Sequence, residues 1–392
     1  GSESVNELPY EYSAVKSAKT ASASPEIEEA VRLILSANNP IIHAGQGVLY
    51  ANASAELKEF AELINSPVMT TLTGKSAFPE DHPLALGTGG ISAPGAVYHF
   101  IDKADLVLGV GCSFTRNHFN AQLPKGKTVI QITNDAGDIN HPYPVTQAVL
   151  GDAKIVLQQL IEETKIHLHE RANEKHASIT AEITEVKKDW INTWMPRLTS
   201  SDIPINPYRV VWELNNLIDH ENSIVTHDSG SPRDQMVPFY DATVPRSYIG
   251  WGHSTQLGYG LPLALGAKLA DPEKLVVNVM GDTAFGTVGM EFETAVRERI
   301  PILTILLNNS SMGGYINYMP YSLEHYGASR LTGNYSKVAE ALGGYSEVIE
   351  DPKDFSSAFR RAEKVVSDGT PALLEVITKE DYFFSNNNPT TH

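Results

Sequence analysis

One stretch, residues 275–314, constrains the fold of this chain more than any other. Leu275 to Met280 is a short Val-rich run typical of a fully buried strand, and Gly281 follows it. The spacing of apolar residues from Met290 to Arg299 predicts a helix, and Ile302 to Leu307 is a second apolar strand run. The order strand, helix, strand predicts a right-handed βαβ unit with two parallel strands.

Two polar side chains follow these strands. Asp282 comes after the first strand and Asn309 after the second, so we expect both at the carboxyl edge of the sheet, where α/β proteins bind ligands. Carboxylate and amide oxygens suit Mg²⁺ or Ca²⁺, and Mg²⁺ often completes its shell with phosphate oxygens. The loop expected at 283–286 opens toward a helix N-terminus, which favours phosphate. The pattern indicates a metal-bridged diphosphate; alternatively, Asp282 caps a helix and Asn309 sits in a turn.

The charge balance narrows the possible partners. Thirty Lys and Arg against 47 Asp and Glu give a net charge of −17. The absence of a basic cluster argues against nucleic acid and acidic membrane as partners. A single cysteine, Cys112, excludes an internal disulfide and is expected to be a small buried residue in a cytoplasmic protein. No apolar run approaches the roughly 18 residues of a membrane-spanning helix.

Strand runs alternate with helical patterns along most of the chain, which predicts an α/β protein with two doubly wound parallel-sheet domains. The first resembles a Rossmann domain, but its Gly45-Gln46-Gly47 turn is a weak dinucleotide signal, and the pattern alone favours a tight strand-to-helix turn. The expected boundaries are a linker at 1–24, a first domain at 25–165, a solvated connecting helix at 166–205, a second domain at 206–385 and a tail at 386–392.

The Gly-Asp pair and the double Asn at two consecutive strand ends resemble the fingerprint of enzymes that depend on thiamine diphosphate (ThDP). The resemblance implies that Asp282 and Asn309 bind Mg²⁺ through their side chains and Ser311 through its backbone carbonyl. It also implies that Leu257, the expected catalytic residue, wedges beneath the cofactor to bend it, and that the carbonyl of Thr255 accepts a hydrogen bond from its aminopyrimidine. The expected cofactor-binding residues are Gly230, Ser231, Thr255, Leu257, Gly281, Asp282, Thr283, Ala284, Asn309, Met312 and Gly313.

The segment from 40 to 152 resembles the middle domain of acetolactate-synthase-type enzymes, which holds FAD, or ADP or CoA in relatives. Gly111-Cys112-Ser113-Phe114 has Ser113 where the family has Arg, which departs from the FAD-binding pattern. Tyr315 and Tyr318 fall where the family borders its substrate, although they could equally pack in the core.

The resemblance implies a 2-keto-acid decarboxylase or carboligase. The alternatives are a 2-hydroxyacyl-CoA lyase or oxalyl-CoA decarboxylase type, which acts on acyl-CoA, and a non-catalytic nucleotide-binding protein with a relict metal site. In the family, a Glu on a preceding pyrimidine-binding domain activates the cofactor across a dimer interface. We therefore expect the chain to be part of a longer protein, or to pair with a subunit that supplies the Glu, in a homodimer or tetramer.

Overall fold

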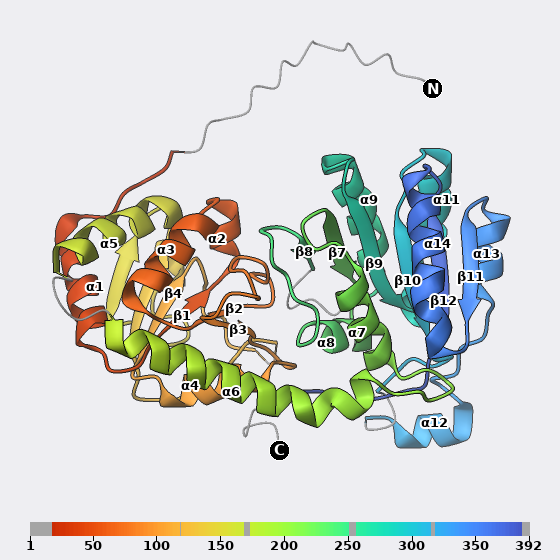
Figure 1. Ribbon diagram of the computed structural model, residues 1–392, viewed down its shortest axis with the longest axis horizontal. Coiled ribbons are helices and arrows are strands. Elements are labelled where there is room, and N and C mark those ends of the chain that lie inside the picture. The colour runs from red at the N-terminus through yellow and green to blue at the C-terminus, as the bar shows by residue number, and fades with distance from the viewer. Residues whose placement is uncertain (1–17, 118, 168–172, 251–255, 315–317, 386–392) are drawn as a thin grey trace, which may run out of the picture.

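The computed structural model describes residues 18–117, 119–167, 173–250, 256–314 and 318–385, and within them the chain forms two six-stranded parallel sheets. Figure 1 shows the first sheet and its helices in one lobe, the second sheet in the other, and the long helix α6 running along both. We call these lobes the first and second domains. The predicted α/β class is confirmed, whereas the predicted domain boundaries stay a prediction.

The first sheet has the strand order β3-β2-β1-β4-β5-β6, which is the order of dinucleotide-binding folds. Its strands are short and almost continuously buried, as parallel strands covered on both faces must be. The strands are β1 (Pro40–Ala44), β2 (Val68–Thr70), β3 (Ala85–Thr88), β4 (Leu106–Val110), β5 (Thr128–Thr133) and β6 (Gln147–Leu150). The helices of this domain are α1 (Ser24–Ser36), α2 (Gln46–Tyr50), α3 (Ser54–Ile64), α4 (Gly95–Lys103) and α5 (Ala153–His167).

The second sheet has the strand order β11-β12-β10-β9-β7-β8, so the order reverses between β7 and β9. Its strands are β7 (Ser223–His227), β8 (Tyr248–Ile249), β9 (Leu275–Gly281), β10 (Leu303–Asn308), β11 (Tyr345–Ile349) and β12 (Ala372–Ile377). Its helices are α7 (Pro207–Leu217), α8 (Ser231–Met236), α9 (Gly260–Ala270), α10 (Asp282–Val288), α11 (Glu291–Arg297), α12 (Pro320–Tyr326), α13 (Tyr335–Ala341) and α14 (Phe355–Ser367).

Alternating residues of β9 feed two separate cores, one on each face of the second sheet. Val277 and Val279 pack with α7 and α14, while Val276 and Met280 pack with residues of α9 and α10. The alternation follows from strand geometry, which points successive side chains to opposite faces. The sheet is therefore covered on both faces, and its open ligand-binding edge is the one at the strands' carboxyl ends.

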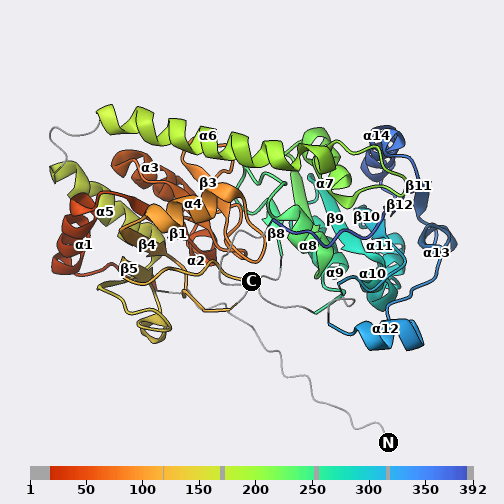
Figure 2. The ribbon, with the colours of Figure 1, turned by 90° about the horizontal axis from the view of Figure 1, so that it is seen from below.

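The connecting segment is helical as predicted, but its solvated character is wrong for one face of α6 (Asn173–Leu198). Ile183 belongs to the core of the first domain, and Trp194 and Leu198 belong to a core of the second. Figure 2 shows α6 lying along both lobes, from α5 to α7. Glu185, Lys188 and Asp189 are exposed, whereas the buried apolar residues of α6 form a stripe that contacts both domains.

Local breaks explain the other differences from the predicted elements. The helix predicted at 290–299 is observed as α11, and a further helix, α10, precedes it. The prediction of a loop at 283–286 is wrong. The helix α10 begins at Asp282, directly after the last residue of β9, so no loop separates the strand from the helix. Short elements without strong periodicity were not expected, namely α2, β3, α4, β6, α8, β8 and α12. Across the described ranges, no helix combines the length and the apolar character needed to cross a membrane.

Candidate functional site

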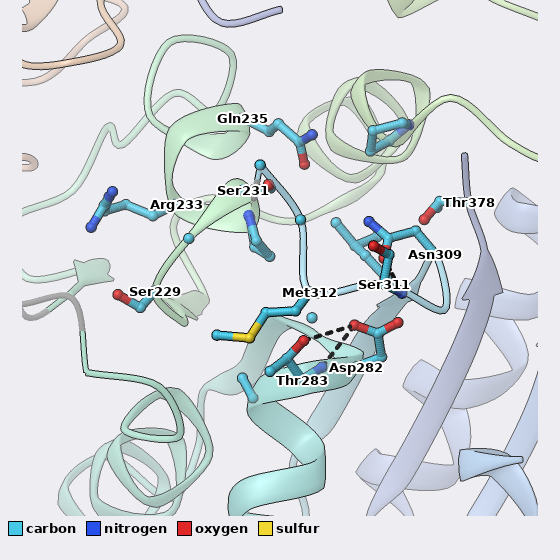
Figure 3. A pocket seen from close by; sticks show the side chains of 18 of the residues that line it. Ser229, Ser231, Arg233, Gln235, Asp282, Thr283, Asn309, Ser311, Met312 and Thr378 are labelled. Atoms are coloured by element: carbon cyan, nitrogen blue, oxygen red, sulfur yellow. Dashed lines mark hydrogen bonds between the residues drawn. The ribbon is translucent and has the colours of Figure 1, made fainter. Parts of the chain in front are cut away.

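A pocket of about 400 Å³ lies at the carboxyl edge of the second sheet. The residues that follow β7, β9, β10 and β12 line it, together with side chains of α8. Figure 3 shows Asp282, Asn309 and Ser311 on one side of this pocket and Ser229, Ser231 and Arg233 on the other. Because the chain reverses its winding between β7 and β9, the pocket occupies the switch point at which such sheets bind ligands.

The register of β9 and β10 brings the predicted metal ligands together. Leu307 pairs with Gly281, so Asp282 and Asn309 follow directly at neighbouring strand ends. Asp282 is buried, and its Oδ1 accepts a hydrogen bond of 2.7 Å from the backbone N–H of Thr283. Its Oδ2 has no hydrogen-bond partner within the described ranges. Burial raises the pKa of Asp282, and the nearby backbone N–H groups oppose that rise.

The double Asn divides two tasks between its members. Asn308 is buried; its Nδ2 donates to Glu375 at 2.7 Å, and its Oδ1 accepts the backbone N–H of Ser310 at 3.0 Å. Ser310 has a φ of +55°, a left-handed conformation that this hydrogen bond stabilises. Asn309, by contrast, lines the pocket, and its Oδ1 accepts the backbone N–H of Ser311 at 3.0 Å. Asn308 therefore shapes the loop that presents Asn309 and Ser311.

These oxygen atoms fit a magnesium ion. A buried carboxylate oxygen without a partner is costly, and a cation relieves that cost. An amide oxygen and a backbone carbonyl are further hard ligands, which Mg²⁺ accepts beside phosphate and water. Among the residues described, no three His, Cys, Asp or Glu side chains gather into a possible metal site. The predicted ion would thus depend on a single carboxylate and on ligands from a bound anion.

The structure places nearly all the predicted site residues around this one pocket. Thr255 and Tyr315 lie outside the described residues. The roles of the others stay predictions, but their convergence from separate parts of the chain is observed. The predicted residues that line the pocket are Gly230, Ser231, Leu257, Gly281, Asp282, Thr283, Ala284, Asn309, Ser311, Met312, Gly313 and Tyr318.

Four positions refine the sequence interpretation. Tyr318 is 82% exposed while lining the pocket, so the alternative of core packing is wrong for it. Leu257 is half-buried, lines the pocket and also packs against the core that contains Ala284. Thr283 and Ala284 are helical, as described above, and reach the pocket from the first turn of α10.

Ten lining residues were not expected. Thr378, Lys379 and Asp381 follow β12, and the rule that parallel strands end at one edge could have found them once β12 was placed next to β10. Arg233 is buried and forms a two-pronged ion pair with Asp234, at 2.8 and 3.0 Å. The complete set is Pro207, Ser229, Pro232, Arg233, Gln235, Leu307, Gly314, Thr378, Lys379 and Asp381.

The Gly45-Gln46-Gly47 turn of the first domain serves backbone packing. A Cβ on Gly45 would lie 2.3 Å from the carbonyl oxygen of Gly111, and the backbone N–H of Gly47 donates to that same oxygen at 2.9 Å. Cys112, next in the chain, is buried, and burial raises the pKa of its thiol to about 12. The glycines thus let the tight turn from β1 to α2 pack against the backbone at the end of β4. Binding of FAD or an ADP-type nucleotide in this domain stays a prediction.

Comparison with protein families matches both domains. Residues 27–160 match the central domain of thiamine pyrophosphate enzymes, and residues 228–376 match their C-terminal TPP binding domain. The chain is 30% identical over 370 residues to a probable acetolactate synthase large subunit of Methanococcus aeolicus, an alignment that covers 89% of this chain and 60% of that protein. It is 27% identical to a glyoxylate carboligase of Escherichia coli O157:H7 over 382 residues, which cover 92% of this chain and 62% of that protein.

Comparison with solved structures supports the fold. A candidate thiamin diphosphate-dependent enzyme from Mycobacterium smegmatis superposes with a TM-score of 0.72 at 24% identity, over 94% of this chain and 67% of that one. The chain spans about 60% of the length of the curated relatives described above.

Proposed function

Because the chain belongs to the thiamine pyrophosphate enzyme family, we propose that its pocket holds the diphosphate of ThDP through Mg²⁺. The observation that carries this proposal is the buried Oδ2 of Asp282, which finds no hydrogen-bond partner among the described residues and lies at the switch point of the second sheet. Asp282, Asn309 and the carbonyl of Ser311 would hold the metal. The residues after β7, Gly230 and Ser231, lie across the pocket, where they would contact the anion.

We further propose that the complete protein is a 2-keto-acid decarboxylase or carboligase resembling acetolactate synthase and glyoxylate carboligase. When bound, ThDP supplies a carbon nucleophile that can also accept the electron pair released when a carboxylate is lost. Leu257 would support the cofactor from the side of α9, where it is backed by the core that contains Ala284. The lining of Leu257, Met312 and Leu307 would keep water from the reacting atoms.

Other parts of the assignment stay predictions. The activating Glu is expected on a pyrimidine-binding domain or partner subunit, in a homodimer or tetramer. The cytoplasmic location rests on cysteine usage alone. A 2-keto acid is the proposed substrate, with acyl-CoA substrates or loss of catalysis as the alternatives.

Calorimetric titration of ThDP into the chain, with and without Mg²⁺, tests the proposed site. We expect binding that requires Mg²⁺ in the wild type and is lost in Asp282→Ala, because the only carboxylate expected to bind the metal is gone. The matched control is Asp102→Ala, which removes an exposed carboxylate of the first domain and should leave binding unchanged. Binding that survives Asp282→Ala would contradict the assignment. If the wild type does not bind ThDP, the same titration on a protein that includes the pyrimidine-binding domain decides whether the site is incomplete or lost.

A further inference from the structure

A buried ion pair lies where the first domain meets the second. Lys75 and Glu80, both in the loop between β2 and β3, are 1% and 7% exposed, and Lys75 Nζ donates to Glu80 Oε2. Burying two charges costs more than their attraction returns unless further hydrogen bonds satisfy both groups. The remaining hydrogen-bond partners of Lys75 and Glu80 therefore show which segment of the chain this ion pair fixes in place.

Those partners belong mainly to the second domain. Lys75 Nζ also donates to the backbone carbonyl of Val237 at 3.1 Å. Glu80 Oε2 accepts the backbone N–H of Ala242 at 2.8 Å, and the N–H of Glu80 donates to the carbonyl of Ala242 at 3.2 Å. These contacts hold the segment 237–247, which connects α8 to β8.

Neighbouring contacts extend the same attachment. The backbone N–H of Arg246 donates to Ser76 Oγ at 3.1 Å, and its guanidinium donates to the carbonyl of Leu49 at 2.8 Å. On the side of the first domain, Thr88 Oγ1 donates to Glu80 Oε1 at 3.2 Å. Both oxygens of Glu80 are thus bound, and the loop is fixed to each domain.

The held segment leads directly to the pocket through α8. Val237 is the residue that follows this helix, and a cation at a helix C-terminus is favourable because the last carbonyls lack partners within the helix. Ser231, Arg233 and Gln235 of α8 line the pocket (Figure 3). The ring of Phe119, also from the first domain, lies 4.4 Å from the guanidinium of Arg233. The first domain therefore contacts α8 at its C-terminal end and at a pocket-lining side chain.

We propose that Lys75 and Glu80 are positioning residues for the pocket of the second domain. Through Val237 and Ala242 they set the place of α8 relative to the strand ends that carry Asp282 and Asn309. The inference rests on the proposed function for the identity of the ligand, whereas the placement of α8 does not depend on any ligand. It also gives the first domain a task in the site that requires no bound nucleotide.

Two variants separate positioning from stability. Lys75→Met leaves Glu80 charged and buried without its partner, so it should lower both stability and ligand affinity. The double variant Lys75→Met/Glu80→Gln removes both charges and keeps an acceptor for Ala242, so it should recover much of the stability. It does not restore a donor to the carbonyl of Val237. The matched control is Lys165→Met, which breaks an exposed pair with Glu59 in the first domain.

The first readout is calorimetric titration of ThDP with Mg²⁺, paired with denaturant unfolding of the same samples. We expect the dissociation constant to rise about tenfold or more in the double variant, as the loss of a charge-assisted hydrogen bond permits. The control should bind like the wild type. If the double variant regains both stability and full affinity, or Lys75→Met loses stability alone, the pair is only structural and the proposal is overturned.

The second readout is amide hydrogen exchange over residues 231–247 in the ligand-free chain. Exchange there should be about tenfold faster in the double variant and unchanged in Lys165→Met, because the loosened segment opens more often. Unchanged exchange would overturn the positioning proposal. If the wild type fails to bind ThDP both as this chain and in a protein that includes the pyrimidine-binding domain, while exchange is faster in the double variant, the proposed function is rejected and the placement of α8 stays supported.

Discussion

The carboxylate of Asp228 accepts a hydrogen bond of 2.8 Å from the backbone N–H of Gly260, 32 positions further along the chain. Its other oxygen accepts the N–H groups of Gly258 at 3.0 Å and Ser229 at 2.8 Å. Asp228 is completely buried, and burial raises its pKa while these N–H groups oppose the rise. A single side chain thus ties the end of β7 to the start of α9 and fixes the backbone beside Leu257, which lines the pocket.

Asp228→Asn should therefore destabilise the chain. The amide keeps one acceptor but turns an NH₂ group toward the N–H of Gly260, so that a buried donor loses its partner. We expect the free energy of unfolding to fall by about 1–3 kcal/mol, measured by denaturant unfolding. Asp102→Asn, an exposed carboxylate, is the control. A stability equal to that of the wild type would show that the N–H of Gly260 finds another acceptor.

In the absence of a cation, the carboxylate of Asp282 should lower the stability of the folded chain. Asp282 keeps a buried oxygen without a partner among the described residues, which costs free energy until a cation arrives. Asp282→Ala should raise the free energy of unfolding of the ligand-free chain by roughly 1 kcal/mol while it removes Mg²⁺-dependent binding of ThDP. Unfolding in EDTA measures the first effect. A clear loss of stability in EDTA would mean that Asp282 serves the fold more than the metal.

His43 should make stability depend on pH. It is buried in β1, neither ring nitrogen has a partner in the part of the chain described, and burial lowers its pKa to about 4. The unfolded state therefore binds a proton below about pH 6.5 that the folded state does not. Stability should fall as the pH is lowered from about 6.5 to about 4, by up to roughly 3 kcal/mol for a group shifted this far.

The variant His43→Leu should remove that part of the pH dependence, because Leu has no proton to bind and leaves no polar atom unpaired. Denaturant unfolding at several pH values between about 7 and 4 checks it. His167→Gln, which changes an exposed histidine of α5, is the control and should keep the wild-type slope. A slope unchanged in His43→Leu would place the pH dependence elsewhere.

Two Gly→Ala substitutions should change the free energy of unfolding in opposite directions. At Gly45 a Cβ would meet the carbonyl oxygen of Gly111 at 2.3 Å, so Gly45→Ala must displace backbone and should cost about 2 kcal/mol or more. At Gly266, exposed within α9, a Cβ meets nothing within 4 Å, so Gly266→Ala should stabilise by roughly 0.5–1 kcal/mol. Thermal unfolding of both variants is sufficient. If both variants changed stability equally, the backbone around Gly45 and Gly111 would be able to move apart at little cost in free energy.

The strand ends that form the site could be predicted because local patterns specify them. The apolar runs before Asp282 and Asn309 have the length and composition of buried parallel strands. β9 and β10 do pair in parallel, and their register places both residues at neighbouring strand ends. The contribution of Lys379 could not be predicted in the same way. Its strand, β12, was expected, but the pairing of β12 with β10 is a choice among non-local partners that periodicity does not encode.

Buried charge was the least predictable feature. Lys75 and Glu80 stand in a polar loop, where charged residues are normally solvated. Their burial depends on the backbone of residues 237–247, more than 150 positions away, which supplies their hydrogen bonds. The burial of α6 was hard to predict for a similar reason, because its apolar residues are few. Ile183 and Trp194 are buried because they pack into the cores of the first and second domains, which distant parts of the chain form.

The sequence by itself determined the α/β class and the parallel strands, and it predicted that the oxygen atoms of Asp282 and Asn309 suit a hard cation. Residue size, polarity and period act over a few neighbours, and those properties are local. The tertiary structure alone decided which strand ends share the pocket, that Asp228 binds Gly260, and that the first domain holds α8 through Lys75. These are contacts between distant segments, and their free energy depends on burial that exists only after the chain has packed.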